Sequence, residues 1–471
     1  MSAVSDRDPD RRYHVAIVGA GPAGFYAAEA LLQSPLGVAV DLYDRLPTPY
    51  GLVRYGVAPD HPKLKQVITV FRGIAAMDGF RFLGNVTIGQ DVSVDDLRRH
   101  YHAVIIACGA ERDRALEIPG ADLEGVHGGM AFVGWYNGHP YRRALAPDLS
   151  GKTAVVLGLG NVALDVARIL AKPSDMLAQT DIAGHALDAL AASGIQRIIV
   201  AGRSGPAHAR CTEKELREFG AIPGCVTTAE SGDFTVPPQR GVAALFDRFP
   251  VADAAMGSRH CHFAFGMRPI AILGNGRVSG VRFAKSPVAE GLRVSGAASE
   301  VDVEADVVIS CIGSRATLLA GLPYLDDETM VRNEAGRICN RLGRVPGLYA
   351  AGWIKRGASG TIGTNRADAV ETVAGLLADL PSLPEPASSS SSLTGAGTST
   401  PIAVTAFNAA ALANKNVDDI SGIAAFTPNL QFDSTAPLSG ASSAAIVFIH
   451  GVGKSGYQVT DDPGVGTYVD G

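Results

Sequence analysis

The chain has 471 residues, 55 of them glycine, and a formal net charge of −6 at pH 7. Most of the negative excess lies after residue 380, and nothing in the charge of the remainder points to a nucleic-acid partner. The chain has no run of 18 apolar residues, and its polar N-terminus lacks a signal-peptide segment. We therefore expect a cytoplasmic protein without a membrane span, large enough for two or three domains.

The first predicted unit is a strand, a glycine turn, a helix and a second strand. Residues 14–18 are apolar, residues 23–32 have helical composition, and residues 38–43 form a second apolar run. The turn between the first strand and the helix reads Gly19-Ala20-Gly21-Pro22-Ala23-Gly24, and Asp44 follows the second strand. This arrangement is the fingerprint of a dinucleotide-binding fold.

Each residue of this fingerprint has its own physical role. Gly19 permits a tight turn, Gly21 lets backbone N–H groups approach a pyrophosphate, and Gly24 allows close packing of helix and strand. The N-terminus of the helix favours the negative charge of the phosphates. The carboxylate of Asp44 is placed to accept hydrogen bonds from a ribose. The glycines alone do not distinguish FAD from NAD.

A second unit of the same kind begins about 140 residues further on. Residues 153–157 form a strand, the turn Gly158-Leu159-Gly160-Asn161-Val162-Ala163 has the spacing GxGxxA, and residues 162–170 form a helix. Short β stretches near 261–283 extend this unit, and the apolar strand 307–312 leads back towards the first. The pattern predicts an α/β fold with two Rossmann-like dinucleotide-binding domains, the second inserted in the first, and parallel sheets covered on both faces.

The six cysteines are scattered and form no CxxC pair. This spacing disfavours an iron–sulfur cluster, a structural zinc site and a redox-active disulfide. We expect no metal.

Two long segments carry a family resemblance. Residues 47–62 read PTPYGLVRYGVAPDHP, and residues 352–364 read GWIKRGASGTIGT. Both closely resemble signatures of the adrenodoxin-reductase type of NADPH–ferredoxin reductase, and the resemblance extends over residues 13–380. It implies a flavoprotein that transfers electrons from NADPH through FAD to a ferredoxin or a similar iron–sulfur acceptor. Flavin suits this task because it takes up two electrons together and releases them singly.

The resemblance also implies which residues contact the cofactors. Besides the glycines of the first turn, it assigns these residues to FAD: Ala23, Asp44, Leu52, Ile88, Trp353, Gly360, Thr361 and Ile362. It assigns these residues to NADPH: Arg114, Leu159, Gly160, Asn161, Val162, Arg203, Ser204 and Glu215.

Two further points concern NADPH and the chemistry. Arg203 follows the strand 198–201 where a carboxylate would repel a 2′-phosphate, which favours NADPH. The family usually has a second arginine beside it, but here the residue is Ser204, so the preference over NADH should be weaker. Arg210 or Lys214 could compensate. His61 and Glu218 match the catalytic His/Glu pair of the family, which could orient the nicotinamide and assist protonation.

The resemblance sets the predicted domains. Residues 1–110 and 313–380 form the two parts of an FAD domain, and residues 111–312 form the inserted NADP domain. Residues 381–400 are rich in Pro, Ser, Gly and Thr and are predicted to be a linker. Residues 401–471 resemble a truncated plug domain of a TonB-dependent receptor, without a barrel. We expect a foreign, partly disordered tail in place of the helical extension of the reductases.

Two alternatives remain open. The flavin subunit of a glutamate-synthase-like enzyme uses similar paired domains, but it also carries cysteine-rich cluster segments. A non-enzymatic receptor-plug-like binding module would take its function from the tail and would bind no flavin.

Overall fold

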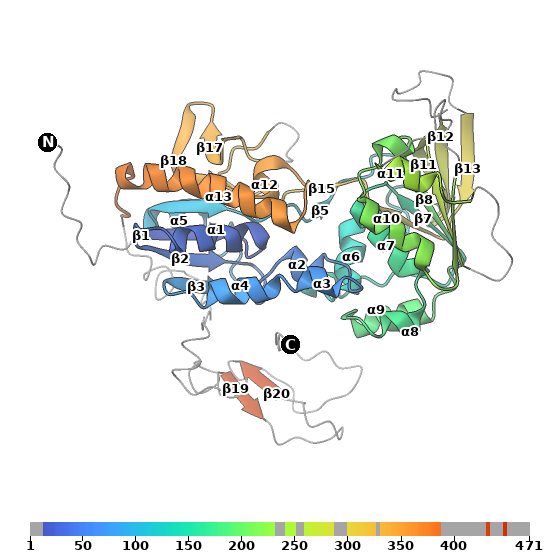
Figure 1. Ribbon diagram of the computed structural model, residues 1–471, viewed down its shortest axis with the longest axis horizontal. Helices are drawn as coiled ribbons and strands as arrows, with labels where there is room; N and C mark the ends of the chain where they lie inside the picture. Colours follow the sequence, from blue (N-terminus) through green and yellow to red (C-terminus); the bar gives the residue numbers. More distant parts are fainter. Residues whose placement is uncertain are drawn as a thin grey trace. The chain divides into compact units, whose positions relative to one another are not determined.

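The computed structural model divides the chain into two compact units (Figure 1). Unit 1 comprises Met1–Tyr50, Ile68–Gly109 and Leu318–Gly471, and unit 2 comprises Gly51–Val67 and Ala110–Thr317. The structure describes residues 13–230, 241–250, 259–286, 299–325 and 330–387, and the backbone of two strands at 430–433 and 446–449.

Unit 1 is built on a seven-stranded sheet with the order β16-β17-β18-β4-β1-β2-β3. The strands from β18 to β3 pair in parallel, whereas β16, β17 and β18 are antiparallel. The apolar runs at residues 14–18 and 38–43 form two of these parallel strands, β1 and β2, as predicted. The strands are β1 (Tyr13–Val18), β2 (Val38–Tyr43), β3 (Phe80–Leu83), β4 (Ala103–Ile106), β16 (Asn333–Glu334), β17 (Arg337–Asn340) and β18 (Gly343–Ala350).

Two long helices of unit 1 come from opposite ends of the described chain and lie side by side. α1 follows the first glycine turn, and α13 begins within the second recognised segment (Figure 1). Both helices bury apolar residues, and their contact brings the first glycine turn and residues 352–364 close together. The helices are α1 (Pro22–Leu32), α4 (Ile68–Ala75), α5 (Val94–His100), α12 (Trp353–Arg356), α13 (Ile362–Asp379) and η4 (Leu380–Ser382).

Unit 2 contains a six-stranded sheet with the order β6-β14-β7-β8-β10-β9, in which every pair is parallel. A second, antiparallel sheet has the order β11-β12-β13. A small pair joins β5 (Arg112–Asp113) to β15 (Ser314–Arg315). The other strands are β6 (Val126–Gly128), β7 (Thr153–Leu157), β8 (Arg197–Ala201), β9 (Cys225–Ala229), β10 (Arg259–Ala264), β11 (Met267–Asn275), β12 (Arg277–Lys285), β13 (Ser299–Glu304) and β14 (Val307–Ser310).

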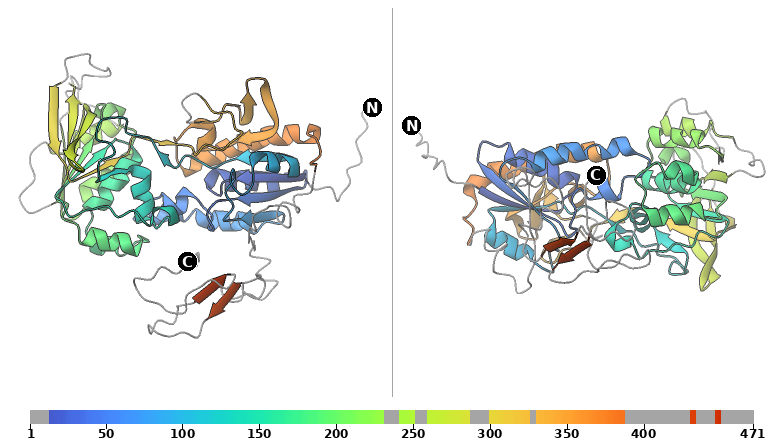
Figure 2. Two further views of the ribbon diagram at one scale, coloured as in Figure 1. Left: turned by 180° about the vertical axis from the view of Figure 1, so that it is seen from behind. Right: turned by 90° about the horizontal axis from the view of Figure 1, so that it is seen from below.

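The two faces of the parallel sheet in unit 2 are covered by different kinds of element. Ala154 and Val156 of β7 pack with helices, whereas Val155 and Leu157 pack with β11 and β12. Side chains alternate along a strand, so one strand serves two cores. The β stretches predicted near residues 261–283 thus include an antiparallel sheet that covers one face, drawn in yellow tones in Figure 2.

The helices of unit 2 include the one that follows its glycine turn. They are α2 (Leu52–Tyr55), α3 (Pro62–Lys65), α6 (Gly129–Tyr136), η1 (Pro140–Arg142), α7 (Asn161–Ala171), α8 (Ser174–Leu177), α9 (Gly184–Ala191), η2 (Pro206–His208), α10 (Glu213–Glu218), η3 (Phe219–Ala221) and α11 (Gly241–Phe246). The predicted helix at residues 162–170 corresponds to α7.

Residues 51–67 belong to unit 2, although the sequence analysis placed them in the first part of the FAD domain. In unit 2, ion pairs fasten Asp60 and His61 of this segment to α7 and α10. Contacts between distant parts of the chain therefore decide the assignment of this segment. The naming of the units as FAD and NADP domains stays a prediction.

The predicted linker begins as an ordered segment. Leu380 is buried in unit 1, and a carboxylate oxygen of Glu385 lies 3.3 Å from Nε2 of His102. Most of the predicted plug-like segment lies outside the described residues, apart from the antiparallel pair β19 (Leu430–Asp433) and β20 (Ile446–Ile449). Among the described residues, no helix has the length and apolar character needed to cross a membrane.

Candidate functional site

The first glycine turn of unit 1 joins β1 to α1. Gly19 has φ +111°, and a Cβ added there would lie 2.5 Å from the carbonyl oxygen of Ala107. A Cβ on Gly24 would lie 2.1 Å from the carbonyl oxygen of Gly19. Packing therefore requires both glycines. A Cβ on Gly21, by contrast, would meet no described atom within 4 Å. This open space lies at the N-terminus of α1, whose first turn has no acidic side chain, and it suits a phosphate.

Asp44 closes this turn from the end of β2. Its Oδ2 accepts a hydrogen bond from the backbone N–H of Ala20 at 2.8 Å, and its Oδ1 accepts one from Leu46 at 2.9 Å. The sequence analysis did not foresee this structural role. Contact with ribose stays a prediction.

The second recognised segment lies against the first glycine turn within unit 1. Gly352 has φ +77°, and a Cβ added there would lie 2.6 Å from Cβ of Ala23. Next to it, Nε1 of Trp353 is buried without a hydrogen-bond partner among the described residues. A buried indole N–H normally has an acceptor, so this atom fits a position beside a polar cofactor.

The remaining residues assigned to FAD lie in three places. Ile88 is buried in unit 1. Gly360 and Thr361 are exposed at the start of α13, with Ile362 as its first residue and no acidic side chain in the first turn. Leu52 begins α2, which belongs to unit 2.

The second glycine turn joins β7 to α7 in unit 2. Gly158 has φ +124°, and a Cβ added there would lie 2.4 Å from the carbonyl oxygen of Cys311. A Cβ on Gly160 would meet no described atom within 4 Å. As at the first turn, one glycine is required by packing and the other faces open space at a helix N-terminus. Val162 is half-buried in the first turn of α7.

A segment after η2 is fastened to this turn. The backbone N–H of Arg210 donates to the carbonyl oxygen of Leu159 at 2.9 Å. The backbone N–H of Thr212 donates to Oδ1 of Asn161, also at 2.9 Å. Asn161 was predicted to contact NADPH, and the structure gives its side chain this bond to the neighbouring loop. The edge of the turn is therefore held by residues about 50 positions further along the chain.

Two cations predicted to bind NADPH are exposed in unit 2. Arg203 and Arg114 have no ion-pair partner among the described residues, and Ser204 is half-buried beside Arg203. Their charges are therefore available to an anion. Arg203 lies close to the second glycine turn, because a Cβ on Gly202 would lie 2.0 Å from Cδ1 of Leu159.

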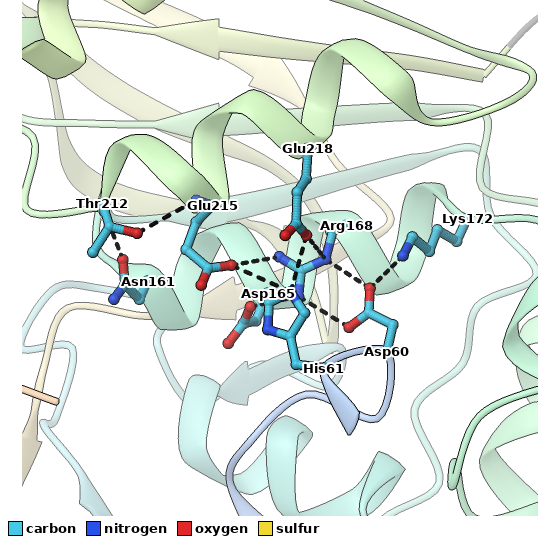
Figure 3. Close-up of polar contacts among 9 residues, drawn as sticks. All are labelled: Asp60, His61, Asn161, Asp165, Arg168, Lys172, Thr212, Glu215 and Glu218. Atoms are coloured by element: carbon cyan, nitrogen blue, oxygen red, sulfur yellow. Dashed lines mark hydrogen bonds and ion pairs between the residues drawn. The ribbon is translucent and has the colours of Figure 1, made fainter. Parts of the chain in front are cut away.

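His61 and Glu218 are brought together within unit 2, although 157 positions separate them in the chain. Nε2 of His61 lies 2.9 Å from Oε2 of Glu218 and 3.5 Å from Oε2 of Glu215 (Figure 3). His61 and Glu215 are both buried. The structure therefore places Glu215, predicted as a cofactor ligand, against the predicted catalytic histidine.

Arg168 of α7 lies at the centre of this group and is completely buried (Figure 3). Its Nε and Nη2 donate to the two oxygens of Asp60 at 2.7 and 3.0 Å, and Nη2 also donates to Asp165 at 2.7 Å. Its Nη1 donates to Glu215 at 3.2 Å, and its Nε lies 3.5 Å from Glu218.

Sequence reasoning missed four members of this network: Asp60, Asp165, Arg168 and Lys172. The spacing of three and four residues between the last three was a usable signal, since it places them on one side of a helix. A charged residue among the mostly apolar buried residues of that helix was a second signal.

The network shifts the pKa values of its members. Burial alone would raise the pKa of Asp60, but hydrogen bonds and charge from Arg168 and Lys172 hold it well below its usual value. Burial raises the pKa of Asp165 to about 6, and the charge of Arg168 only partly opposes this. The carboxylates, despite burial, keep the pKa of Arg168 well above its usual value.

Two triads here have the ligand types of a metal site, with their ligand atoms within 4.8 Å of one another. They are Asp60, His61 and Glu218, and His61, Asp165 and Glu215. Arg168 already donates hydrogen bonds to three of these carboxylates and supplies the positive charge that a metal ion would bring. The arrangement therefore favours an ion-pair network over a metal centre.

Comparison with known proteins agrees with this geometry. Residues 13–219 match the family model described as pyridine nucleotide-disulphide oxidoreductase. The chain is 41% identical over 404 residues to the mitochondrial NADPH:adrenodoxin oxidoreductase of Salvelinus fontinalis, with 81% of this chain and 80% of the relative covered. It is 41% identical over 389 residues to the NADPH-ferredoxin reductase FprA of Mycobacterium tuberculosis, with 79% and 84% covered.

A solved structure gives the same result. Mycobacterium tuberculosis FprA in complex with NADPH superimposes with a TM-score of 0.73 at 39% identity, covering 83% of this chain and 87% of that chain. The resemblance based on residues 47–62 and 352–364 is thereby confirmed. The chain belongs to the family of NADPH:adrenodoxin oxidoreductases and NADPH-ferredoxin reductases.

Proposed function

We propose that this protein is an FAD-dependent oxidoreductase that transfers electrons from NADPH to a ferredoxin-type iron–sulfur protein. The observation that carries this proposal is the pair of glycine turns, one in each unit, each with open space at a helix N-terminus. Such a turn suits a dinucleotide pyrophosphate, and two of them allow one flavin and one nicotinamide cofactor. FAD, when bound, accepts electrons in pairs and releases them singly.

Unit 1 offers the residues that would hold FAD. The turn at residues 19–24 would bind the pyrophosphate, and Asp44 would accept hydrogen bonds from the ribose. The buried N–H of Trp353 would find its missing acceptor on the cofactor. The free N–H groups at the start of α13 would stabilise negative charge.

Unit 2 offers the residues that would hold NADPH. The turn at residues 158–163 would bind the pyrophosphate, and Arg203 would bind the 2′-phosphate. His61, held by Glu218, would orient the nicotinamide and exchange a proton at Nε2. The iron–sulfur acceptor and a cytoplasmic location stay predictions.

The proposal is tested by the visible spectrum of the purified protein and by anaerobic titration with NADPH. We expect the absorption of bound flavin and its bleaching by NADPH. Reduction of cytochrome c should then depend on an added ferredoxin. A colourless protein that takes up no FAD when supplied would refute the proposal.

Replacing His61 with alanine should slow reduction of the flavin by NADPH roughly ten- to hundredfold while FAD stays bound. That range corresponds to loss of a hydrogen bond involving a charged group, about 1.5–3 kcal/mol. Stopped-flow absorption measures the rate. His185→Ala, at an exposed histidine of α9, is the matched control and should leave the rate unchanged. An unchanged rate in His61→Ala would remove His61 from the mechanism.

Replacing Arg203 with alanine should raise KM for NADPH about ten- to hundredfold and change KM for NADH less than about twofold. A charge-assisted hydrogen bond to the 2′-phosphate, about 1.5–3 kcal/mol, is lost only with NADPH. Steady-state reduction of an artificial dye measures both constants. Arg197→Ala, at the exposed start of β8, the strand that precedes Arg203, should change neither KM value. Equal effects on both nucleotides would contradict the assignment.

A further inference from the structure

Arg203 alone provides little for a dianionic phosphate. One guanidinium can form a bidentate pair, but a 2′-phosphate offers three oxygens and close to two negative charges. The neighbouring Ser204 contributes only a hydroxyl group. A second cation near Arg203 would complete such a site.

Arg210 is held at the second glycine turn by its backbone. Its N–H donates to the carbonyl oxygen of Leu159 at 2.9 Å, and it forms an isolated parallel bridge with Gly160. Two residues later, the N–H of Thr212 donates to Asn161. These bonds fix the Cα of Arg210 beside the turn, so that little backbone entropy remains to be lost when its side chain binds a ligand.

Leu159 contacts the chain next to Arg203 and at Arg210. Its side chain packs on Gly202, the residue before Arg203, and its carbonyl oxygen accepts the bond from Arg210. Both arginine side chains are exposed and have no ion-pair partner among the described residues. Two unneutralised arginines whose backbones lie beside the same leucine are suited to a shared anion.

Lys214 is a weaker candidate for the same role. It is exposed in the first turn of α10, between the acidic residues Glu213 and Glu215. No backbone bond fastens it to the glycine turn, and the neighbouring carboxylates would repel a phosphate.

We propose that Arg210 joins Arg203 in binding the 2′-phosphate of NADPH and is a specificity-determining residue for NADPH over NADH. This inference rests on the function proposed above. Arg210 thus performs, from the loop after η2, the task that a second arginine at position 204 would perform.

The test measures binding without catalysis. Isothermal titration calorimetry compares adenosine 2′,5′-bisphosphate with adenosine 5′-monophosphate, which differ only in the 2′-phosphate. We expect Arg210→Ala to weaken binding of the bisphosphate about tenfold and of the monophosphate less than about twofold. Arg210→Lys should lose less, because it keeps the charge. Lys214→Ala is the matched control and should change neither affinity.

A rescue experiment tests the geometry. Adding Ser204→Arg to Arg210→Ala should restore most of the affinity for the bisphosphate, because a second guanidinium returns from the other side. Unchanged binding in Arg210→Ala would overturn the proposal. Equal weakening of both ligands would also overturn it, since Arg210 would then act on the 5′-phosphate.

Failure of the general function would look different. A wild-type protein that binds neither nucleotide would refute both proposals. If the wild-type protein and Arg210→Ala prefer the bisphosphate over the monophosphate to the same degree, only the role of Arg210 is refuted.

Discussion

Replacing Arg168 with methionine is expected to lower the free energy of unfolding by about 3–5 kcal/mol, the usual cost of removing one partner from a buried ion pair. Methionine keeps much of the volume, so the loss comes mainly from charge. Without the guanidinium, Asp60, Asp165, Glu215 and Glu218 would share Lys172 as their only neighbouring lysine or arginine in the described network. Thermal unfolding should shift down on the order of 10 °C.

The controls separate charge from packing. Arg217→Met, at an exposed arginine paired with Glu213 in α10, should change stability by less than about 0.5 kcal/mol. Adding Asp165→Asn to Arg168→Met should recover part of the loss, because one uncompensated carboxylate is removed. A wild-type unfolding midpoint in Arg168→Met would contradict the account.

The free energy of unfolding should also depend on pH through Asp165. The folded-state pKa of Asp165, about 6, lies above its unfolded value, so the folded protein binds this proton more tightly. The resulting stability is fully present below the unfolded pKa and is lost as pH rises through about 6. The deficit of Arg168→Met should therefore be smaller near about pH 5 than near about pH 8, because protonation of Asp165 removes one uncompensated charge.

Replacing Gly21 with alanine is expected to weaken FAD binding by about tenfold or more, with no loss of stability in the FAD-free protein. The residue has φ −85° and ψ −174°, which alanine adopts readily, and the added Cβ would touch no described atom. The methyl group would instead occupy the space proposed for the pyrophosphate and lengthen its hydrogen bonds, each worth about 1.5–3 kcal/mol. Flavin fluorescence titration measures the affinity.

Two other glycines of unit 1 are matched controls. Gly73 lies in α4, where an added Cβ would meet no described atom within 4 Å. Gly73→Ala should raise the free energy of unfolding by about 0.5–1 kcal/mol without affecting FAD binding. Gly24→Ala should destabilise the protein by about 1–3 kcal/mol because its Cβ would overlap Gly19. Unchanged FAD affinity in Gly21→Ala would show that no phosphate lies at this turn.

The pair of helices α7 and α10 connects the features of unit 2. At one end, Asn161 accepts a hydrogen bond from Thr212, which also caps α10. Further along, Arg168 joins α7 to the carboxylates of α10 and to Asp60. The glycine turn and the environment of His61 are therefore held by the same two helices.

The sequence alone determined the local features of this protein. Gly19 and Gly158 have the positive φ that their turns require, and the apolar runs at residues 14–18 and 38–43 are strands of the parallel sheet. Such features depend on neighbours within a few residues, where steric limits and side-chain periodicity act directly. The long signatures at residues 47–62 and 352–364 also identified the family.

Only the tertiary structure decided which distant residues meet. Asp60 and Arg168, 108 positions apart in the chain, form an ion pair within unit 2, to which residues 51–67 belong. The backbone hydrogen bond from Arg210 to Leu159 could not be predicted either, because it joins two loops far apart in the sequence. Long-range contacts have no signature in the local sequence. Their energy comes from ion pairs and hydrogen bonds that form only when folding brings the partners together, away from water.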